Sequence, residues 1–522
     1  MLDRRDGKHS YNVMSAVRVS GKRIARNTLI NYVQVVVSAL VGLVISRLVL
    51  QTLGASDYGL YGVVGGAIAM FTFISGSMSA TTTRFVNIEM GKKDGNVNYV
   101  FNISNVLHIA VAIVVLLLLE SVGIYYILNY LNVAQGKEND ALFVFHVSTL
   151  ITCVGITNVP YRALLVANEC FGTIATVEIT KTILKLLLVV VLSYYKGNAL
   201  RMYAIMMCTG TVVSFVAYHV ICMRRWPKIV RWNPIKHLKA YKEQFSFSNW
   251  SLLGTIAEML KSHGTHLLIN LFFGTIANAA YAVSLTVKKN INVLAHNFSR
   301  AAAPQITQLI GLNEIDKATD LAINISRIHL LLSEIVFFPL LVELDFVLHL
   351  WLGDNIPSET LDFCKWTLIV ALVVSTKSGI GTLIYAFGKL KWFEIQKCFW
   401  FLLSFPIGYW LFSIGMPPHS IIILLIIADI LNRAGRLTLL HMLFGVDSIA
   451  FVRKAWSRPL WVLLIMIGYT MLYGAYWNDG NIAKVIGIFV TALCSVAVAF
   501  SVGLTTNEKE KLLSYVKKHL IG

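Results

Sequence analysis

Long apolar runs separated by short polar segments dominate the chain. Fourteen runs hold about 20 mostly apolar residues each, the length at which a helix crosses the hydrocarbon core of a bilayer. They lie near residues 27–50, 60–82, 103–127, 141–164, 172–195, 199–222, 246–271, 277–299, 320–342, 366–388, 394–413, 420–443, 459–476 and 481–504. The pattern predicts an all-α polytopic membrane protein with about 14 transmembrane helices. The second, seventh and eighth runs are the weakest, so twelve or thirteen spans are the alternative.

Composition agrees with a membrane protein. The apolar set makes up 56% of the 522 residues and charged residues only 14%, whereas soluble globular proteins carry about 25% charged residues. A formal charge of +18 is therefore first explained by membrane orientation, and no nucleic-acid partner is expected. The seven cysteines lack the spacing of a zinc or disulfide framework. We expect no metal, no cofactor and no catalytic residues.

Basic residues are distributed unevenly between the two sides of the predicted helices. With the N-terminus inside, the inner segments hold 30 Lys and Arg, the outer segments hold 3, and 12 lie within spans. Cytoplasmic loops are enriched in Lys and Arg. The bias therefore predicts a multi-pass protein with both termini in the cytoplasm.

The chain shows signs of an internal duplication. Gly54 and Gly274 are 220 positions apart, and the same offset relates Tyr61 to Tyr281 and Gly91 to Gly311. Two such repeats would share one orientation and enclose a central cavity. The predicted organisation comprises a basic cytoplasmic tail (1–26), an N-terminal six-helix lobe (27–222), a basic cytoplasmic linker (223–245), a C-terminal six-helix lobe (246–443), helices 13 and 14 (444–504) and a cytoplasmic tail (505–522).

These features resemble a known family of exporters. The residues that carry the resemblance are Leu-Gly-Ala-Ser-Asp-Tyr-Gly-Leu-Tyr-Gly at 53–62 and Thr83-Arg84-Phe85, together with the layout of six, six and two helices. The chain resembles O-antigen/polysaccharide-type flippases of the multidrug/oligosaccharidyl-lipid/polysaccharide (MATE-like) superfamily.

The resemblance implies a transporter of the bacterial inner membrane and not an enzyme. Its expected cargo is an undecaprenyl-diphosphate-linked oligosaccharide, which crosses from the inner to the outer leaflet by alternating access during O-antigen and lipopolysaccharide synthesis. Membrane lipids are expected to contact it, and glycan polymerases or glycosyltransferases are further expected partners.

Charged residues near the middle of predicted spans are candidates for the binding site, because each costs about 2.5–3.5 kcal/mol when it faces lipid. A net-cationic cavity would suit the phosphates of an anionic ligand. The cationic candidates are Lys181, Lys185, Lys261, Lys288, Lys289, Lys377 and Arg433, with Arg47 near the outer end of the first helix. The candidates for ion coupling are Glu178, Glu258, Glu334, Asp429 and His266.

Other interpretations remain open. The charges could form internal salt bridges that hold helices together, Glu178 with Lys181 or Lys185 and Asp429 with Arg433. A multidrug or cation antiporter of the same superfamily is the first alternative function, although organic cations would need an acidic or aromatic cavity. A membrane glycan polymerase or glycosyltransferase is the second, with its acid and base in the outer loop at 343–365.

Overall fold

The computed structural model describes residues 21–69, 71–129, 136–352, 356–357, 359–476, 480–506 and 508–510, and every regular element in them is a helix. This confirms the all-α class. The predicted N-terminal tail up to residue 20 and the C-terminal tail after residue 510 lie outside the described residues. The chain divides into two compact units, Met1–Thr255 with Thr307–Glu314 and Ile256–Ile306 with Ile315–Gly522.

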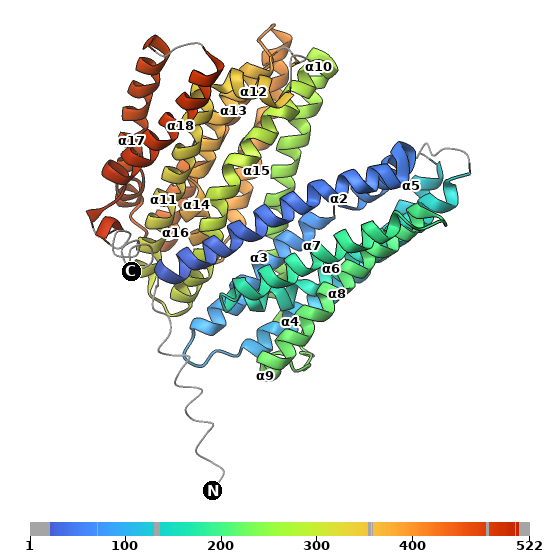
Figure 1. Cartoon of the computed structure of the whole chain (residues 1–522). Helices are drawn as coiled ribbons and strands as arrows, with labels where there is room; N and C mark the ends of the chain where they lie inside the picture. Colours follow the sequence, from blue (N-terminus) through green and yellow to red (C-terminus); the bar gives the residue numbers. More distant parts are fainter. Residues whose placement is uncertain are drawn as a thin grey trace, which may run out of the picture. The chain divides into compact units, whose positions relative to one another are not determined.

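The first unit contains the N-terminal helices and both ends of the long helix α10 (Figure 1). Its elements are α2 (Gly21–Ala69), α3 (Thr72–Gly91), α4 (Val97–Leu118), a π-helical turn (Leu119–Gly123), α5 (Ile124–Asn129), α6 (Glu138–Ala167), α7 (Phe171–Leu192), α8 (Ala199–Arg225), α9 (Pro227–Val230), a 3₁₀ turn (Leu238–Tyr241) and parts of α10 (Lys242–Gly311). Most boundaries agree with the predicted runs within a few residues.

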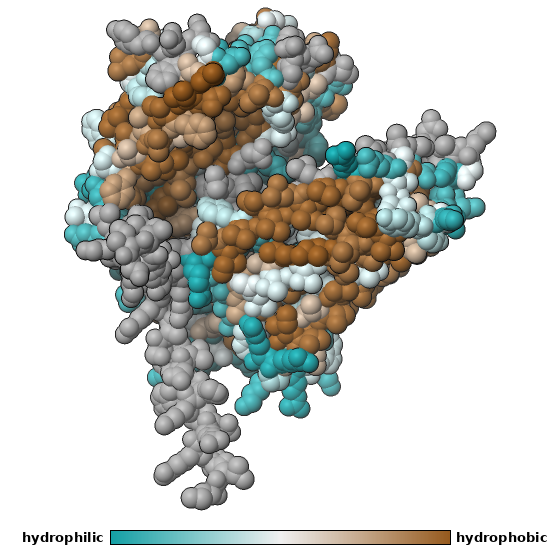
Figure 2. Space-filling model, in the orientation of Figure 1, coloured by the Kyte–Doolittle hydropathy of each residue, from teal (hydrophilic) through white to brown (hydrophobic). Residues whose placement is uncertain are grey.

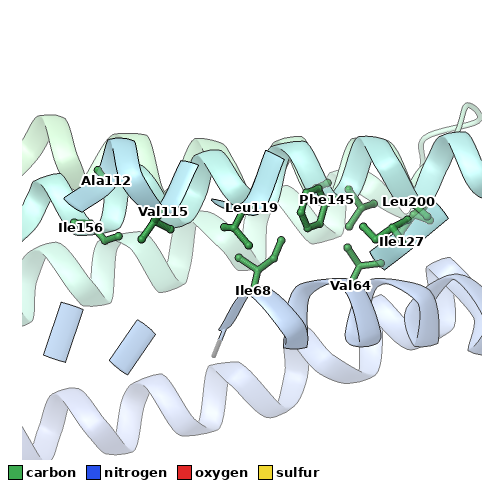
Figure 3. Packing of buried hydrophobic residues seen from close by; sticks show 12 residues of the cluster. Val64, Ile68, Ala112, Val115, Leu119, Ile127, Phe145, Ile156 and Leu200 are labelled. Atoms are coloured by element: carbon green, nitrogen blue, oxygen red, sulfur yellow. The ribbon is translucent and has the colours of Figure 1, made fainter. Parts of the chain in front are cut away.

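Apolar side chains from α2, α4, α6 and α8 form a core in the first unit (Figure 3). Val64 and Ile68 of α2 face Val115 of α4 and its π-helical continuation, while Phe145 packs from α6. Because helices in lipid gain little from apolar contact alone, close packing of this kind supplies much of the association between them.

The two longest helices are interrupted at equivalent glycines. Gly54 in α2 has φ 73° and ψ 170°, and Gly274 in α10 has φ 76° and ψ −168°. Residues with a side chain rarely adopt this conformation, so glycine allows an abrupt change of direction. The first and second runs, and the seventh and eighth, are therefore joined without a loop, because helix meets helix at one residue. The matching geometry, 220 positions apart, is what a duplicated half would produce.

The second unit contains the middle of α10 and all later helices. They are α11 (Ile315–Val342), α12 (Leu344–Leu352), α13 (Thr360–Ser375), α14 (Ser378–Phe387), α15 (Lys391–Ser413), α16 (Ser420–Phe444), α17 (Ser448–Tyr476), α18 (Asn481–Val498) and a π-helical turn (Ala499–Gly503). Helices α17 and α18 both pack against α11. The last predicted pair of helices is thus docked on the second unit.

Much of the helical surface is apolar, as expected for contact with lipid. Side chains such as Leu117 and Leu493 are 64% and 71% exposed, and Figure 2 shows broad apolar areas along the helices with polar groups toward their ends. Within the part of the chain that the structure describes, seven helices are long and apolar enough to cross a membrane, or eight if the bent pair α13 and α14 forms one span. Both α7 and α16 fall outside this set, since each carries three charged residues near its middle. The count of fourteen spans remains a prediction.

Candidate functional site

A cavity of about 430 Å³ lies within the second unit. Helices α10, α11, α14, α15 and α16 contribute to its wall, with Lys377 just before the first turn of α14. The charged lining residues are Glu258, Lys377, Glu394, Lys397, Asp429, Arg433 and Arg436. Four of these residues, Glu258, Lys377, Asp429 and Arg433, are candidates from the sequence analysis. Their role in binding remains a prediction.

A second cavity of about 230 Å³ shares the side chain of Glu258 with the first. Its charged lining residues are Glu258, Lys261 and Lys288, and much of the remaining lining is aromatic or aliphatic. Taken together, the walls of the two cavities carry six Lys and Arg side chains and three carboxylates. The second unit therefore has a pair of neighbouring cavities that are basic on balance.

One buried ion pair links the two cavity walls. Lys261 Nζ of α10 lies 2.7 Å from Asp429 Oδ2 of α16, and the two residues are only 7% and 4% exposed. The ammonium group also lies 4.2 Å from the ring centre of Phe401, close enough for a cation–π interaction. Asp429 therefore pairs with a residue 168 positions away, and the predicted pairing with Arg433 is wrong.

A second carboxylate pairs with two cations. Glu394 of α15 lies 2.5 Å from Lys397 Nζ and 3.3 Å from an Arg436 nitrogen. Arg436 also donates from Nε to the Asn432 amide oxygen at 3.3 Å. Sequence reasoning missed Glu394 and Lys397 because they lie at the edge of an apolar run, where charges are usually solvated. The three-residue spacing on one helix was the signal that could have found them.

Two cations in these walls, Arg433 and Lys288, form no ion pair among the described residues. Arg433 donates hydrogen bonds to the Val373 carbonyl oxygen and the Thr376 hydroxyl, both neutral acceptors. Among the ion pairs of the described residues, none includes Arg433 or Lys288. Lys377 approaches Glu258 at 3.6 Å, and both side chains are about half exposed where they line the first cavity.

The first unit holds a smaller charged cluster. Lys181 Nζ lies 2.6 Å from Glu178 on α7, which is one of the predicted internal salt bridges. Tyr218 of α8 donates its hydroxyl hydrogen to Glu178 at 3.0 Å. Lys185 packs along Gly210 of α8, where an added Cβ would lie 3.3 Å from its Cε. Here a single carboxylate has a partner on each of two helices.

Besides Glu178, Lys181 and Lys185, four more predicted site residues lie outside both cavity walls. Arg47 and Lys289 are exposed on α2 and α10. His266 makes a 2.6 Å hydrogen bond to Asn278 across the break at Gly274. Glu334 is 2% exposed, and within the described chain its Oε2 has no hydrogen-bond partner. The roles suggested for these residues remain predictions.

One group of side chains has donor atoms close enough to hold a metal ion. Glu359, Asp362 and His419 have ligand atoms within 4.8 Å of one another, but both carboxylate residues are exposed. Exposed acidic groups often lie together without a metal, so this arrangement alone does not establish a site.

Comparison with known proteins finds similarity in structure only. No family model and no curated protein matches the sequence. An outward-facing multidrug resistance MATE family transporter of the MOP superfamily aligns with a TM-score of 0.67 at 13% identity, covering 80% of this chain and 94% of its own. A Vibrio cholerae MATE transporter aligns with a TM-score of 0.63 at 16% identity, covering 84% and 99%.

A third neighbour comes from Pyrococcus furiosus. It is a MOP superfamily transporter whose reversed pocket polarity suggests a different function, and it aligns with a TM-score of 0.65 at 12% identity over 80% of this chain and 94% of its own. At this level of sequence identity the similarity concerns the fold alone. The chain has the fold of MATE transporters.

Proposed function

We propose that this protein is a membrane transporter that flips a lipid-diphosphate-linked oligosaccharide between leaflets by alternating access. The observation that carries the proposal is the excess of six basic over three acidic side chains around the two cavities of the second unit. A diphosphate brings the negative charge that these walls lack, and Arg presents several donors to phosphate oxygens.

The cations that form no ion pair within the described chain are the preferred ligands for phosphate. Arg433 and Lys288 can bind an anion without first giving up a carboxylate, whereas Lys261 would have to leave Asp429. The transporter fold supports movement of a ligand, and the Pyrococcus furiosus neighbour is a case in which pocket polarity is linked to a change of function. The undecaprenyl carrier, the inner membrane, cytoplasmic termini and the polysaccharide-synthesis partners come from the resemblance and remain part of the proposal.

A flipping assay tests this function. Purified full-length protein is reconstituted in liposomes with a fluorescent polyprenyl-diphosphate oligosaccharide, and an external quencher reports its arrival in the outer leaflet. We expect Arg433→Gln with Lys288→Gln to reduce the initial rate at least about tenfold, as for loss of one charge-assisted contact. Arg224→Gln, an exposed change at the end of α8, is the matched control. An unchanged rate in the double variant would contradict the proposal.

A multidrug antiporter is the second candidate, because one structural neighbour is a multidrug resistance transporter and Glu258 is partly exposed in both cavity walls. Tighter binding of a lipophilic cation than of a diphosphate would favour this function. For either cargo, Glu178, Glu258, Glu334, Asp429 and His266 remain candidates for ion coupling. Transport that persists after collapse of the proton and sodium gradients would remove that role.

A further inference from the structure

The second cavity differs from the first in the chemistry of its wall. Three charged residues, Glu258, Lys261 and Lys288, and two hydroxyl residues share it with a set of aromatic and aliphatic side chains. These apolar lining residues are Tyr281, Leu285, Val370, Ile422 and Leu425. A sugar placed here would leave hydroxyl groups against apolar surface, whereas an aliphatic chain would bury that surface favourably.

The two cavities follow one another along the same helices. On α16 the second cavity is lined at Ile422 and Leu425, and the first begins at Asp429 and continues to Arg436. The bent pair shows the same order, with Val370 of α13 in the second cavity and Lys377 in the first. The second cavity, with its cluster of aliphatic side chains, is thus displaced toward the N-terminal ends of α13 and α16.

The ion pair between Lys261 and Asp429 lies where the cavities adjoin. Lys261 lines the second cavity, Asp429 lines the first, and Glu258 lines both. A phosphate at this junction would meet Lys261 and Lys288 from one side and Arg433 from the other. A ligand with a phosphate between a polar part and an aliphatic part matches this sequence of surfaces.

We propose that the second cavity is a subsite for the first isoprenoid-like aliphatic units joined to the diphosphate, while the first cavity takes the diphosphate and its sugar. This rests on the proposed function and adds that the protein recognises the lipid beside the phosphate. The direction from the first cavity to the second agrees with the predicted topology, since the N-terminal ends of α13 and α16 are expected on the outer side. A lipid in the inner leaflet has its chain pointing toward the middle of the membrane.

Two soluble probes separate recognition of the chain from recognition of the phosphates. Binding of pyrophosphate and of geranyl diphosphate to detergent-solubilised full-length protein is measured by calorimetry. Each buried methylene contributes about 0.8 kcal/mol, so we expect geranyl diphosphate to bind wild type at least about tenfold more tightly than pyrophosphate. Leu285→Trp fills the second cavity and is expected to reduce this ratio below about threefold by excluding the chain.

Controls separate the subsite from damage to the fold and from detergent effects. Leu271→Trp makes the same exchange on α10 at a side chain that is 66% exposed, and it should keep the wild-type ratio. Leu425→Phe fills the cavity from α16 with a smaller change in volume and should also lower the ratio. Equal affinities of wild type for both probes, or a wild-type ratio in both cavity-filling variants, would overturn the subsite and leave the diphosphate site in place. Failure of wild type to bind either probe would overturn the proposed function itself.

Discussion

Gly91 of α3 and Gly311 of α10 allow their two helices to cross at backbone contact. A Cβ on Gly91 would lie 2.4 Å from the carbonyl oxygen of Gln308, and a Cβ on Gly311 would lie 2.6 Å from that of Ile88. Gly91 and Gly311 are 220 positions apart, and so are Ile88 and Gln308. The contact is therefore reciprocal, as between equivalent residues about a two-fold axis.

This crossing predicts a strict requirement for glycine. Gly91→Ala and Gly311→Ala should each destabilise the protein by about 1–3 kcal/mol, because the added methyl group meets backbone atoms that cannot move aside easily. Thermal unfolding in detergent would measure the change. Gly76→Ala lies on the same helix α3, where a Cβ meets nothing within 4 Å, and should not lower the midpoint. Equal midpoints for Gly91→Ala and Gly76→Ala would contradict the close approach.

The buried pair Lys261–Asp429 predicts that substitutions of the two residues have non-additive effects on stability. Lys261→Met leaves the Asp429 carboxylate buried without its partner, which should cost roughly 3–5 kcal/mol of stability. The double variant Lys261→Met with Asp429→Leu should recover most of this loss in the same unfolding assay. Lys454→Met removes one side of an exposed pair at 3.9 Å and should cost about 1 kcal/mol or less. A double variant less stable than Lys261→Met would disprove the coupling.

Glu258 allows the two candidate functions to be distinguished by charge. Glu258→Gln removes a negative charge shared by both cavities, so pyrophosphate should bind several-fold more tightly and a lipophilic cation more weakly. Titration calorimetry on the purified protein would give both affinities. If the cation is the stronger wild-type ligand and Glu258→Gln abolishes its binding, the antiporter is favoured. Glu343→Gln, in the loop after α11 and absent from both cavity walls, serves as the control.

The stability of the segment after α18 is expected to depend on pH. Burial alone would raise the pKa of Glu508, but hydrogen bonds from the Thr505 backbone N–H and hydroxyl, with the Arg327 guanidinium, hold that pKa below its usual value. Because the pKa of Glu508 is lowered in the folded state, its carboxylate contributes fully to stability above its unfolded-state pKa of about 4.3. This contribution is lost as the pH falls through the folded-state pKa.

Hydrogen exchange of the segment after α18 would measure this effect. Wild type should be more protected than Glu508→Gln near neutral pH, and the difference should shrink once the pH falls below about 4. Glu510→Gln changes an exposed residue of the same segment and should show little effect. A difference between wild type and Glu508→Gln that stays constant down to pH 3 would rule out the linkage.

Much of the helical architecture could be predicted because apolar runs leave few alternatives in a membrane. The sequence also paired Gly54 with Gly274 by their offset, but it did not predict that a helix breaks at each of them. Partners across helices were harder to predict, since periodicity describes one helix at a time. It identified Glu178 with Lys181 correctly, but it paired Asp429 with Arg433 instead of Lys261. Glu394 was missed because its burial depends on where α15 packs against α16.

The distance along the chain between Lys261 and Asp429 sets an order for biogenesis. Ribosomes add about 5–20 residues per second, so the 168 positions from Lys261 to Asp429 take roughly 10–30 s to synthesise at that rate. During this interval the newly inserted α10 carries an ammonium group whose carboxylate has not yet been translated. Water, lipid headgroups or the insertion machinery must accommodate it until α16 arrives, which makes this lysine a sensitive point for quality control of the nascent chain.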